Sequence, residues 1–362
     1  MKLETRPCDE GYRLTADFER QSASYIVWPE RPDNWRDGAK PAQQTFTKLA
    51  EMIAEVQPVT MLVNEDQYKN ARSMLSERIR VVEMSSNDAW MKDFGPFFVK
   101  NKDGLVRAVS FNFNAWGGLI DGLYFPWDKD IEVASKICDL DGIDYYDSSV
   151  IIEGCALHTD GQGTIITTED VLLSEDRNPA MTKEKMESIL KEYLGAKKII
   201  WIKHGYFMDE TGGDIDNLLN FTAPGRLVLN WTDDQNHVMY ETCRDVERVL
   251  KNSSDANGQK FELIRLPLPK KELRLTEQEA ETVDYVNGLM PRDQGQLLTA
   301  TYVNYVTVNG MVIVPEFNDE NDALAKRILQ NEYPNRKIVG LPAREVLNGG
   351  GGLHTIVDNR PE

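Results

Sequence analysis

Near its C-terminal end the chain reads Asn348-Gly349-Gly350-Gly351-Gly352-Leu353-His354-Thr355-Ile356-Val357. Four consecutive glycines remove every Cβ from a short length of backbone, so the main chain can take positive φ angles or be approached closely by a ligand. One interpretation is a loose loop before a last strand. The other is a loop that places the residue after His354 in a pocket, at a position suited to a nucleophile. Here that residue is Thr355.

Upstream of this run, apolar and polar residues alternate in a way that predicts an α/β fold. Strands are expected over 22–28, 59–63 and 79–84, with helices over 41–56 and 66–76 between them. Each strand–helix–strand unit is long enough for a parallel crossover.

The same order of strand, acidic or glycine-rich loop, strand and helix recurs along the chain in about five modules. Two further helices are expected over 182–194 and 240–251, and two hairpins over 97–113 and 297–314. Because no linker or low-complexity run divides the modules, we predict a single domain over 1–362. A circular arrangement would bring the module loops to one central cavity.

Composition excludes several classes of function. The formal net charge is -18 and the isoelectric point is near 4.8, which argues against nucleic acid or an anionic membrane as a partner. There is no apolar run of roughly 18 residues and no signal-peptide core, and the four cysteines form no CxxC pair. We therefore expect a soluble cytoplasmic protein with reduced thiols whose partner is a small cation.

Acidic residues in separate loops are candidates for holding that cation. Asp214 and Asp216 are two residues apart, so on an extended segment they would point the same way. Asp93 and Glu153 lie in comparable loops. Gathered in one cavity, such carboxylates repel one another unless a cation or proton intervenes, and a planar guanidinium pairs with carboxylates in fork geometry. The alternative is that these carboxylates cap helices and turns.

Trp90 and Trp116 are close in sequence to these acids and could wall the pocket over a cation, or they could be ordinary core aromatics. His158, His204 and His237 are expected to be surface or hydrogen-bonded residues. No twelve-residue calcium loop and no HExxH motif occurs, so we expect no metal.

Motifs spread in order over nearly the whole chain resemble agmatine deiminase. They are Trp28-Pro29-Glu30-Arg31-Pro32-Asp33-Asn34-Trp35-Arg36, Asn87-Asp88-Ala89-Trp90, Phe113-Asn114-Ala115-Trp116-Gly117-Gly118, Leu123-Tyr124-Phe125-Pro126-Trp127-Asp128, Asp160-Gly161-Gln162-Gly163-Thr164, Arg177-Asn178-Pro179, Met290-Pro291-Arg292 and the terminal glycine run. The resemblance implies the five-bladed α/β propeller, or pentein, of the guanidine-modifying, peptidyl-arginine deiminase-like superfamily. It also implies hydrolysis of agmatine to N-carbamoylputrescine and ammonia, a step of polyamine metabolism, without a cofactor.

The family mechanism, as the resemblance implies it, uses a Cys that attacks the guanidinium carbon and a His as general acid and base. Two Asp hold the guanidinium nitrogens, and these positions are Asp93 and Asp216. Glu153 stands at the position that orients the His. The two reactive positions differ, because Asp214 stands where the family has the His and Thr355 where it has the Cys.

Three neighbouring positions also depart from the family pattern: Gly352 for an Asn, Cys155 for a Gly and Lys92 for an Arg. A Thr hydroxyl without a general base is a poor nucleophile, and loss of a catalytic nucleophile commonly lowers the rate by orders of magnitude. We therefore predict a weak or inactive paralogue, that is, a pseudoenzyme. We also expect the protein to be a homo-oligomer. The alternatives are an active agmatine deiminase and a non-catalytic binder of agmatine or polyamines.

Overall fold

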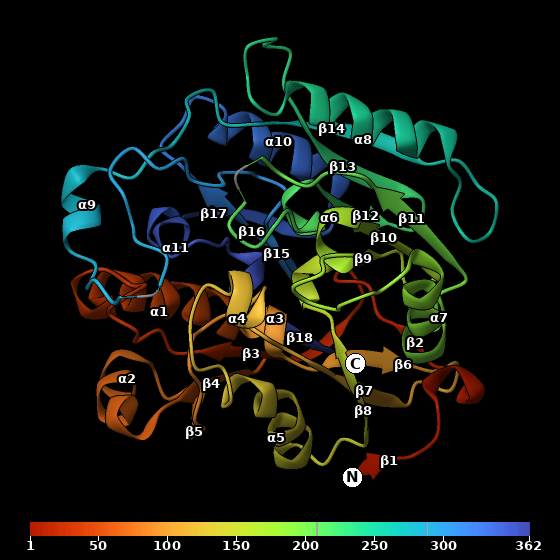
Figure 1. Cartoon of the computed structure of the whole chain (residues 1–362), viewed down its shortest axis with the longest axis horizontal. Coiled ribbons are helices and arrows are strands. Elements are labelled where there is room, and N and C mark those ends of the chain that lie inside the picture. The colour runs from red at the N-terminus through yellow and green to blue at the C-terminus, as the bar shows by residue number, and fades with distance from the viewer. Residues whose placement is uncertain (208, 288) are drawn as a thin grey trace.

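The computed structural model describes residues 1–207, 209–287 and 289–362 of the chain. The described residues form five sheets that stand around a common centre (Figure 1). This is the predicted five-bladed α/β propeller. None of the helices in the described ranges has both the length and the apolar composition needed to cross a bilayer.

One blade shows the repeating unit clearly. β9 (Leu157–Thr159) pairs antiparallel with β10 (Thr164–Thr168), and α7 (Lys183–Leu194) then leads to β11 (Lys198–Ile202), which pairs parallel with β10. Helix α7 begins at a Thr182 cap and ends at Gly195 in the left-handed conformation, the usual signals for the two ends of a helix. The predicted parallel crossover is confirmed.

Three other blades repeat this order of hairpin, helix and parallel strand. Their elements are β6 (Phe97–Lys100), β7 (Val106–Asn112), α5 (Val133–Leu140) and β8 (Tyr145–Ile151); β12 (Leu219–Ala223), β13 (Arg226–Trp231), α8 (Tyr240–Asn252) and β14 (Glu262–Pro267); and β15 (Val306–Val308), β16 (Met311–Glu316), α10 (Asp322–Glu332) and β17 (Lys337–Pro342).

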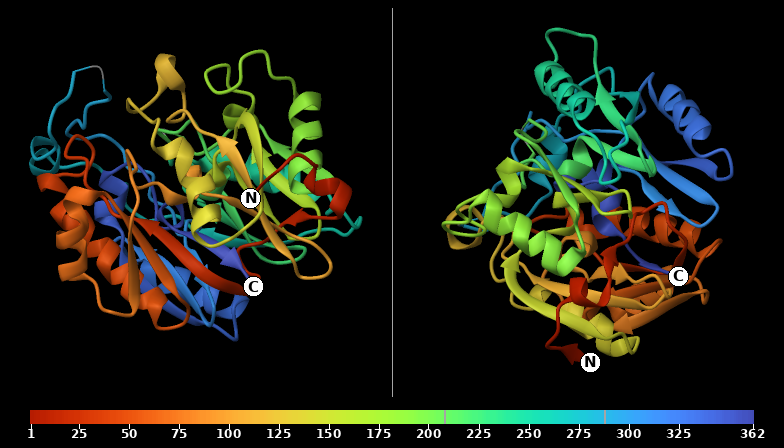
Figure 2. Two further views of the ribbon diagram at one scale, coloured as in Figure 1. Left: turned by 90° about the horizontal axis from the view of Figure 1, so that it is seen from below. Right: turned by 90° about the vertical axis from the view of Figure 1, so that its right-hand side faces the viewer.

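The fifth blade joins the two ends of the chain. β18 (Asp358–Pro361) pairs antiparallel with β3 (Gln21–Val27), and α1 (Lys40–Ala54) crosses from β3 to the parallel strand β4 (Val59–Val63). After α2 (Tyr68–Met74), β5 (Ile79–Glu83) pairs parallel with β4. The N-terminus itself belongs to the neighbouring blade, where β1 (Lys2–Leu3) pairs parallel with β8, and Figure 2 marks both ends of the chain.

The apolar pattern that predicted α1 is the face by which this helix packs on the core. Phe46, Leu49 and Ile53 are fully buried in one cluster with strands β3 and β4. Burial of each such side chain contributes about 1.5–3 kcal/mol to stability. Partly buried Met52, at the fourth predicted apolar position, packs at the edge of this cluster.

One expected strand is much shorter than predicted. The sequence favoured a strand from 297 to 308, but only Val306–Val308 is paired in β15. The side chains just before it point into polar contacts, because Thr301 donates to Asn230 and Asn304 donates to Asp216. These contacts hold the backbone at the centre of the ring instead of in the sheet.

A short segment precedes the first strand of every blade. These segments are α3 (Met91–Phe94), the 3-10 turns η5 (Gly154–Ala156), η6 (Ile215–Asn217) and η7 (His354–Ile356), and residues 301–305. The pseudo-fivefold repeat therefore carries five equivalent turns to the centre, where the candidate site lies.

Candidate functional site

A pocket of about 580 Å³ opens at the centre of the ring. Five of the residues singled out from the sequence line it: Trp90, Trp116, Asp214, Asp216 and Thr355. Glu210 and Arg292, which both line the pocket, form an ion pair with each other.

The glycine run is a wall of this pocket and not a loose loop. A Cβ on Gly349 would lie 2.5 Å from the ring of Trp35, and one on Gly351 would overlap the ring of Trp90. Gly350 has φ 105°, a conformation that favours glycine. The indoles therefore pack directly on the backbone, and Thr355 is held with its hydroxyl oxygen accepting from the Gly352 amide at 3.2 Å.

The sequence analysis considered Asp214 and Asp216 on an extended segment. In the structure this segment instead forms the 3-10 turn η6. The turn forms because Asp209 accepts from the Asp214 amide at 2.9 Å and from the Asn217 side chain at 3.1 Å. Both carboxylates still reach the pocket. Asp216 Oδ2 accepts from Asn304 Nδ2 at 2.9 Å, so neighbouring turns are tied to each other.

Asp93 and Glu153 lie behind the pocket wall and not on it. Asp93 Oδ1 accepts from the Cys155 amide at 3.1 Å, and Glu153 Oε1 accepts from Arg177 Nε at 2.7 Å. Both acids are buried. The fold thus brings all four predicted carboxylates to one region, with two of them facing the cavity and two beneath it.

These carboxylates share an unusual feature. Each has one buried oxygen that has no hydrogen-bond partner among the described residues: Asp93 Oδ2, Glu153 Oε2, Asp214 Oδ1 and Asp216 Oδ1. Buried polar atoms in folded proteins are nearly always paired. Four unpaired carboxylate oxygens in one region therefore indicate a place for a ligand with several donors.

Burial and mutual repulsion shift the proton equilibria of this cluster. Burial, with the charges of Asp216 and Glu153, raises the pKa of Asp93 to about 7 against the hydrogen bond from Cys155. Burial and the charge of Asp209 also raise the pKa of Asp214 well above its usual range, although Arg177 opposes this shift.

Sequence reasoning missed the roles of Arg177, His354 and Asp17. Arg177 is nearly fully buried and ion-pairs with Glu153, and its place in the Arg177-Asn178-Pro179 motif was the signal available in the sequence. His354 bridges two carboxylates, with Nδ1 at 2.9 Å from Asp216 Oδ2 and Nε2 at 2.9 Å from Asp17 Oδ2. No local pattern in the sequence connects residue 17 with this site.

The expectation that the three histidines are surface or hydrogen-bonded residues is confirmed for His204 and His237 but is wrong for His158. His204 is exposed beside Asp170 and His237 is half-buried, whereas His158 is buried with its ring centroid 5.3 Å from that of His354. Cys155 is also buried, and burial followed by the charge of Asp216 raises the pKa of its thiol well above the usual range.

Comparison with known proteins gives a consistent result. Residues 13–361 match the model of the Porphyromonas-type peptidyl-arginine deiminase family. A relative from Latilactobacillus sakei, named "Putative agmatine deiminase", is 52 % identical over 360 residues, which cover 99 % of this chain and 98 % of that protein.

Solved structures of the same kind superpose closely. An agmatine deiminase of Enterococcus faecalis has a TM-score of 0.97 at 43 % identity, over 100 % of this chain and 99 % of that one. The C. jejuni agmatine deiminase with substrate bound has a TM-score of 0.82 at 26 % identity, over 100 % of this chain and 98 % of that one. The chain therefore belongs to the Porphyromonas-type peptidyl-arginine deiminase family, alongside agmatine deiminases.

Proposed function

We propose that this protein binds agmatine, or a closely related guanidine or polyamine cation, and hydrolyses it weakly or not at all. The observation that carries the proposal is the set of four buried carboxylate oxygens that have no partner in the described part of the chain. A guanidinium presents five N–H donors in one plane, so a single ligand group can satisfy several of these oxygens at once.

The remaining walls suit the same ligand. Trp90 and Trp116 line the cavity with their ring centroids 6.3 Å apart, and aromatic faces attract cations. The ligands named for relatives of this chain, agmatine among them, are of this class.

Weak hydrolysis follows from the two groups at the reactive positions. Thr355 offers a hydroxyl, which needs a general base to become a nucleophile. Asp214 stands at the position of the family's His, so the imidazole that would transfer protons is replaced by a carboxyl group, whose pKa burial and the charge of Asp209 raise well above its usual range. We therefore propose that guanidinium binding is retained while attack on its carbon is lost.

Two measurements on the wild-type protein test the proposal. Titration calorimetry with agmatine is expected to give one saturable site per chain, with weaker binding of putrescine because an ammonium has fewer and less spread donors than a guanidinium. A product assay at high protein concentration is expected to show little N-carbamoylputrescine. Absence of agmatine binding would refute the binding role, and rapid turnover would refute the loss of chemistry.

The expectations of one domain, a cytoplasmic location and a homo-oligomer also stay proposals. Pairing of β3 with β18 supports the single domain over 1–362, because it makes the first and last modules one blade. Equilibrium sedimentation of the full chain would measure the oligomer size.

A further inference from the structure

We propose that Asp17, His158 and His354 form a binding site for a divalent transition metal ion of the zinc class, on the side of Asp216 away from Thr355. One carboxylate oxygen and one ring nitrogen from each histidine all lie within 4.8 Å of one another. The three residues come from the N-terminal segment, β9 and η7. The set of two histidines and one carboxylate is one that catalytic zinc sites and non-haem iron sites use.

The distances are close to what an ion requires. Asp17 Oδ2 lies 2.9 Å from His354 Nε2 and 3.8 Å from His158 Nδ1. A tetrahedral zinc ion with bonds of about 2.0–2.1 Å separates its ligand atoms by roughly 3.4 Å. Small rotations of these side chains are sufficient to admit the ion, which would replace the hydrogen on His354 Nε2.

The group behind His354 is arranged as it is around known metal sites. His354 faces Asp216 Oδ2 with its other nitrogen, Nδ1, at 2.9 Å. Histidines that bind metals almost always donate their second N–H to a carboxylate or a carbonyl. The Lys92 ammonium lies 3.2 Å from Asp17 Oδ1, which fixes that carboxyl group and leaves Oδ2 directed at the histidines.

His158 supplies an independent observation. Its side chain is only 3 % exposed, and Nε2 is buried without a partner in any described residue. In the assigned orientation of the His158 ring, Nδ1 faces Asp17. A half-turn of the ring would bring the edge that carries Nε2 to this side instead. A buried imidazole that lacks hydrogen bonds needs a partner that is neither backbone nor side chain, and an ion at Asp17 would provide one.

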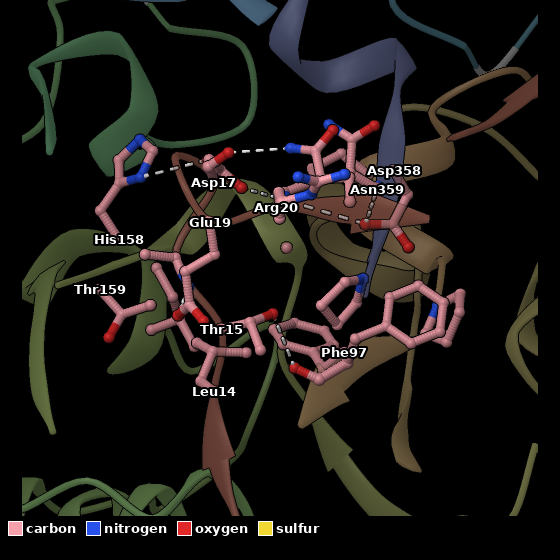
Figure 3. A pocket seen from close by; sticks show the side chains of 18 residues that line it. Leu14, Thr15, Asp17, Glu19, Arg20, Phe97, His158, Thr159, Asp358 and Asn359 are labelled. Atoms are coloured by element: carbon pink, nitrogen blue, oxygen red, sulfur yellow. Dashed lines mark hydrogen bonds and ion pairs between the residues drawn. The ribbon is translucent and has the colours of Figure 1, made fainter. Parts of the chain in front are cut away.

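A path to the ion exists. Asp17 and His158 line a pocket of about 620 Å³, separate from the one at Thr355, and Figure 3 shows both side chains directed at each other within it. The fourth coordination position would face this pocket and hold water. Two nitrogens and one oxygen favour Zn²⁺, Co²⁺ or Ni²⁺ over Mg²⁺ or Ca²⁺, which prefer oxygen ligands.

A second group of possible ligands shares His354, namely Cys155, Asp216 and His354. Cys155 lines neither this pocket nor the one at Thr355 and is 1 % exposed, so an ion there would have no open position. The open pocket favours Asp17 and His158 instead. Bound there, the ion would join the N-terminal segment, β9 and η7 at the centre of the ring.

The test uses the full chain freed of metal by a chelator and then titrated with Zn²⁺ in a calorimeter, and with Co²⁺ in a visible spectrometer. We expect one equivalent of Zn²⁺ to bind and the melting temperature to rise, because the ion binds only the folded state. His158→Gln and Asp17→Asn are each expected to weaken binding about tenfold or more. His204→Gln is the matched control, since it removes a histidine that lies beside a carboxylate at the surface.

Co²⁺ distinguishes the ligand sets. Visible bands of a tetrahedral nitrogen and oxygen site, lost in His158→Gln, support the proposal. A sulfur-to-cobalt charge-transfer band would place the ion at Cys155 and overturn the assignment. Less than stoichiometric binding, or binding that His158→Gln and Asp17→Asn leave unchanged while circular dichroism shows both variants folded, would overturn the site altogether.

Discussion

The acids on the two sides of Asp216 differ in whether the protein itself supplies their partners. Towards His354, Asp216 Oδ2 and Asp17 are each hydrogen-bonded to an imidazole, and Asp17 also pairs with Lys92. Towards Thr355, oxygens of Asp93 and Asp214 stay unpaired within the described residues. On the first side the protein's own cationic groups neutralise these two acids, although His158 Nε2 and Asp358 Oδ2 nearby stay unpaired in the described part of the chain, and a metal ion there would displace the proton between Asp17 and His354. On the second, uncompensated side no described cation pairs with Asp93 or Asp214, so we propose that these acids are available to a cationic ligand.

The largest expected effect comes from introducing a thiol and an imidazole at the two positions that we propose have lost the reactive groups. Thr355→Cys with Asp214→His should form N-carbamoylputrescine at least about 10³-fold faster than wild type, because nucleophile and base act as a unit. Either single change should recover far less, since a thiol among carboxylates stays protonated. The measurement is product formed per hour, and Thr355→Ser with Asp214→His is the control without a thiol. Equal rates for wild type and the double variant would contradict this prediction.

Removing a carboxylate should have opposite consequences on the two sides. Asp17→Ala removes the nearer of the two carboxylates beside Lys92 and one of the two carboxylates that His354 bridges, so we expect about 3 kcal/mol less free energy of unfolding. Asp214→Asn keeps an oxygen for the hydroxyl of Thr211 and removes a carboxyl group that folding must either protonate or hold as a charge beside other acids, so the ligand-free protein should become more stable at neutral pH. Urea denaturation without ligand or metal measures both. Destabilisation by both variants to a similar extent would mean that the two sides do not differ.

Asp93→Asn tests whether an acid beneath the pocket wall holds the ligand. The amide can still accept from the Cys155 amide but loses the charge that attracts a guanidinium. We expect agmatine affinity to fall about 10–100-fold, as for loss of a charged hydrogen bond. Asp103→Asn, in the exposed turn between β6 and β7, should leave the affinity unchanged. Calorimetry decides, and equal affinities in the two variants would exclude Asp93 from the site.

Agmatine affinity should rise with pH on the uncompensated side. Asp93 has a pKa raised to about 7 by burial, Asp216 and Glu153, and it must be ionised to hold a cation. Cys155 also adjoins it, and the Arg177 guanidinium acts in the opposite direction. Affinity should increase about tenfold from pH 6 to 8 and level off above pH 7, since each binding event releases this proton.

The same shift has a consequence for stability, with the opposite sign. The folded protein holds a proton on Asp93 between about pH 4 and 7, where the unfolded chain has lost it, so stability of the ligand-free protein should fall as pH rises through this range. In the binding experiment, an agmatine affinity that does not change from pH 6 to 8 would contradict a pKa of about 7 for Asp93.

The smallest expected effect concerns Cys155. Its raised thiol pKa and burial predict slow alkylation by iodoacetamide at neutral pH, with no change on addition of agmatine. Mass spectrometry of tryptic peptides can follow Cys155 against the half-buried Cys8, which should react faster. Rapid labelling that agmatine blocks would indicate a thiol at the ligand.

The sequence predicted the parts of this molecule that local pattern determines. The apolar spacing at Phe46, Leu49 and Ile53 was sufficient for α1, and the motif at Asp93 was sufficient to propose an acid near the ligand. What it could not supply are contacts between segments far apart in the chain. The bend at η6 depends on Asp209 accepting from the Asp214 amide, and the bridge from Asp17 to His354 joins residues 337 positions apart.

The pairing of β18 with β3 has a consequence for how the protein is made. Thr355 and His354 reach the centre only when the strand that follows them closes the ring against residues 21–25. Contacts of such large sequence separation form slowly. During synthesis the other four turns emerge before η7 and β18, so the acids gather without the last wall of the pocket until β18 has also emerged. A chain shortened by a few C-terminal residues should therefore lose its ligand site while keeping most of its blades.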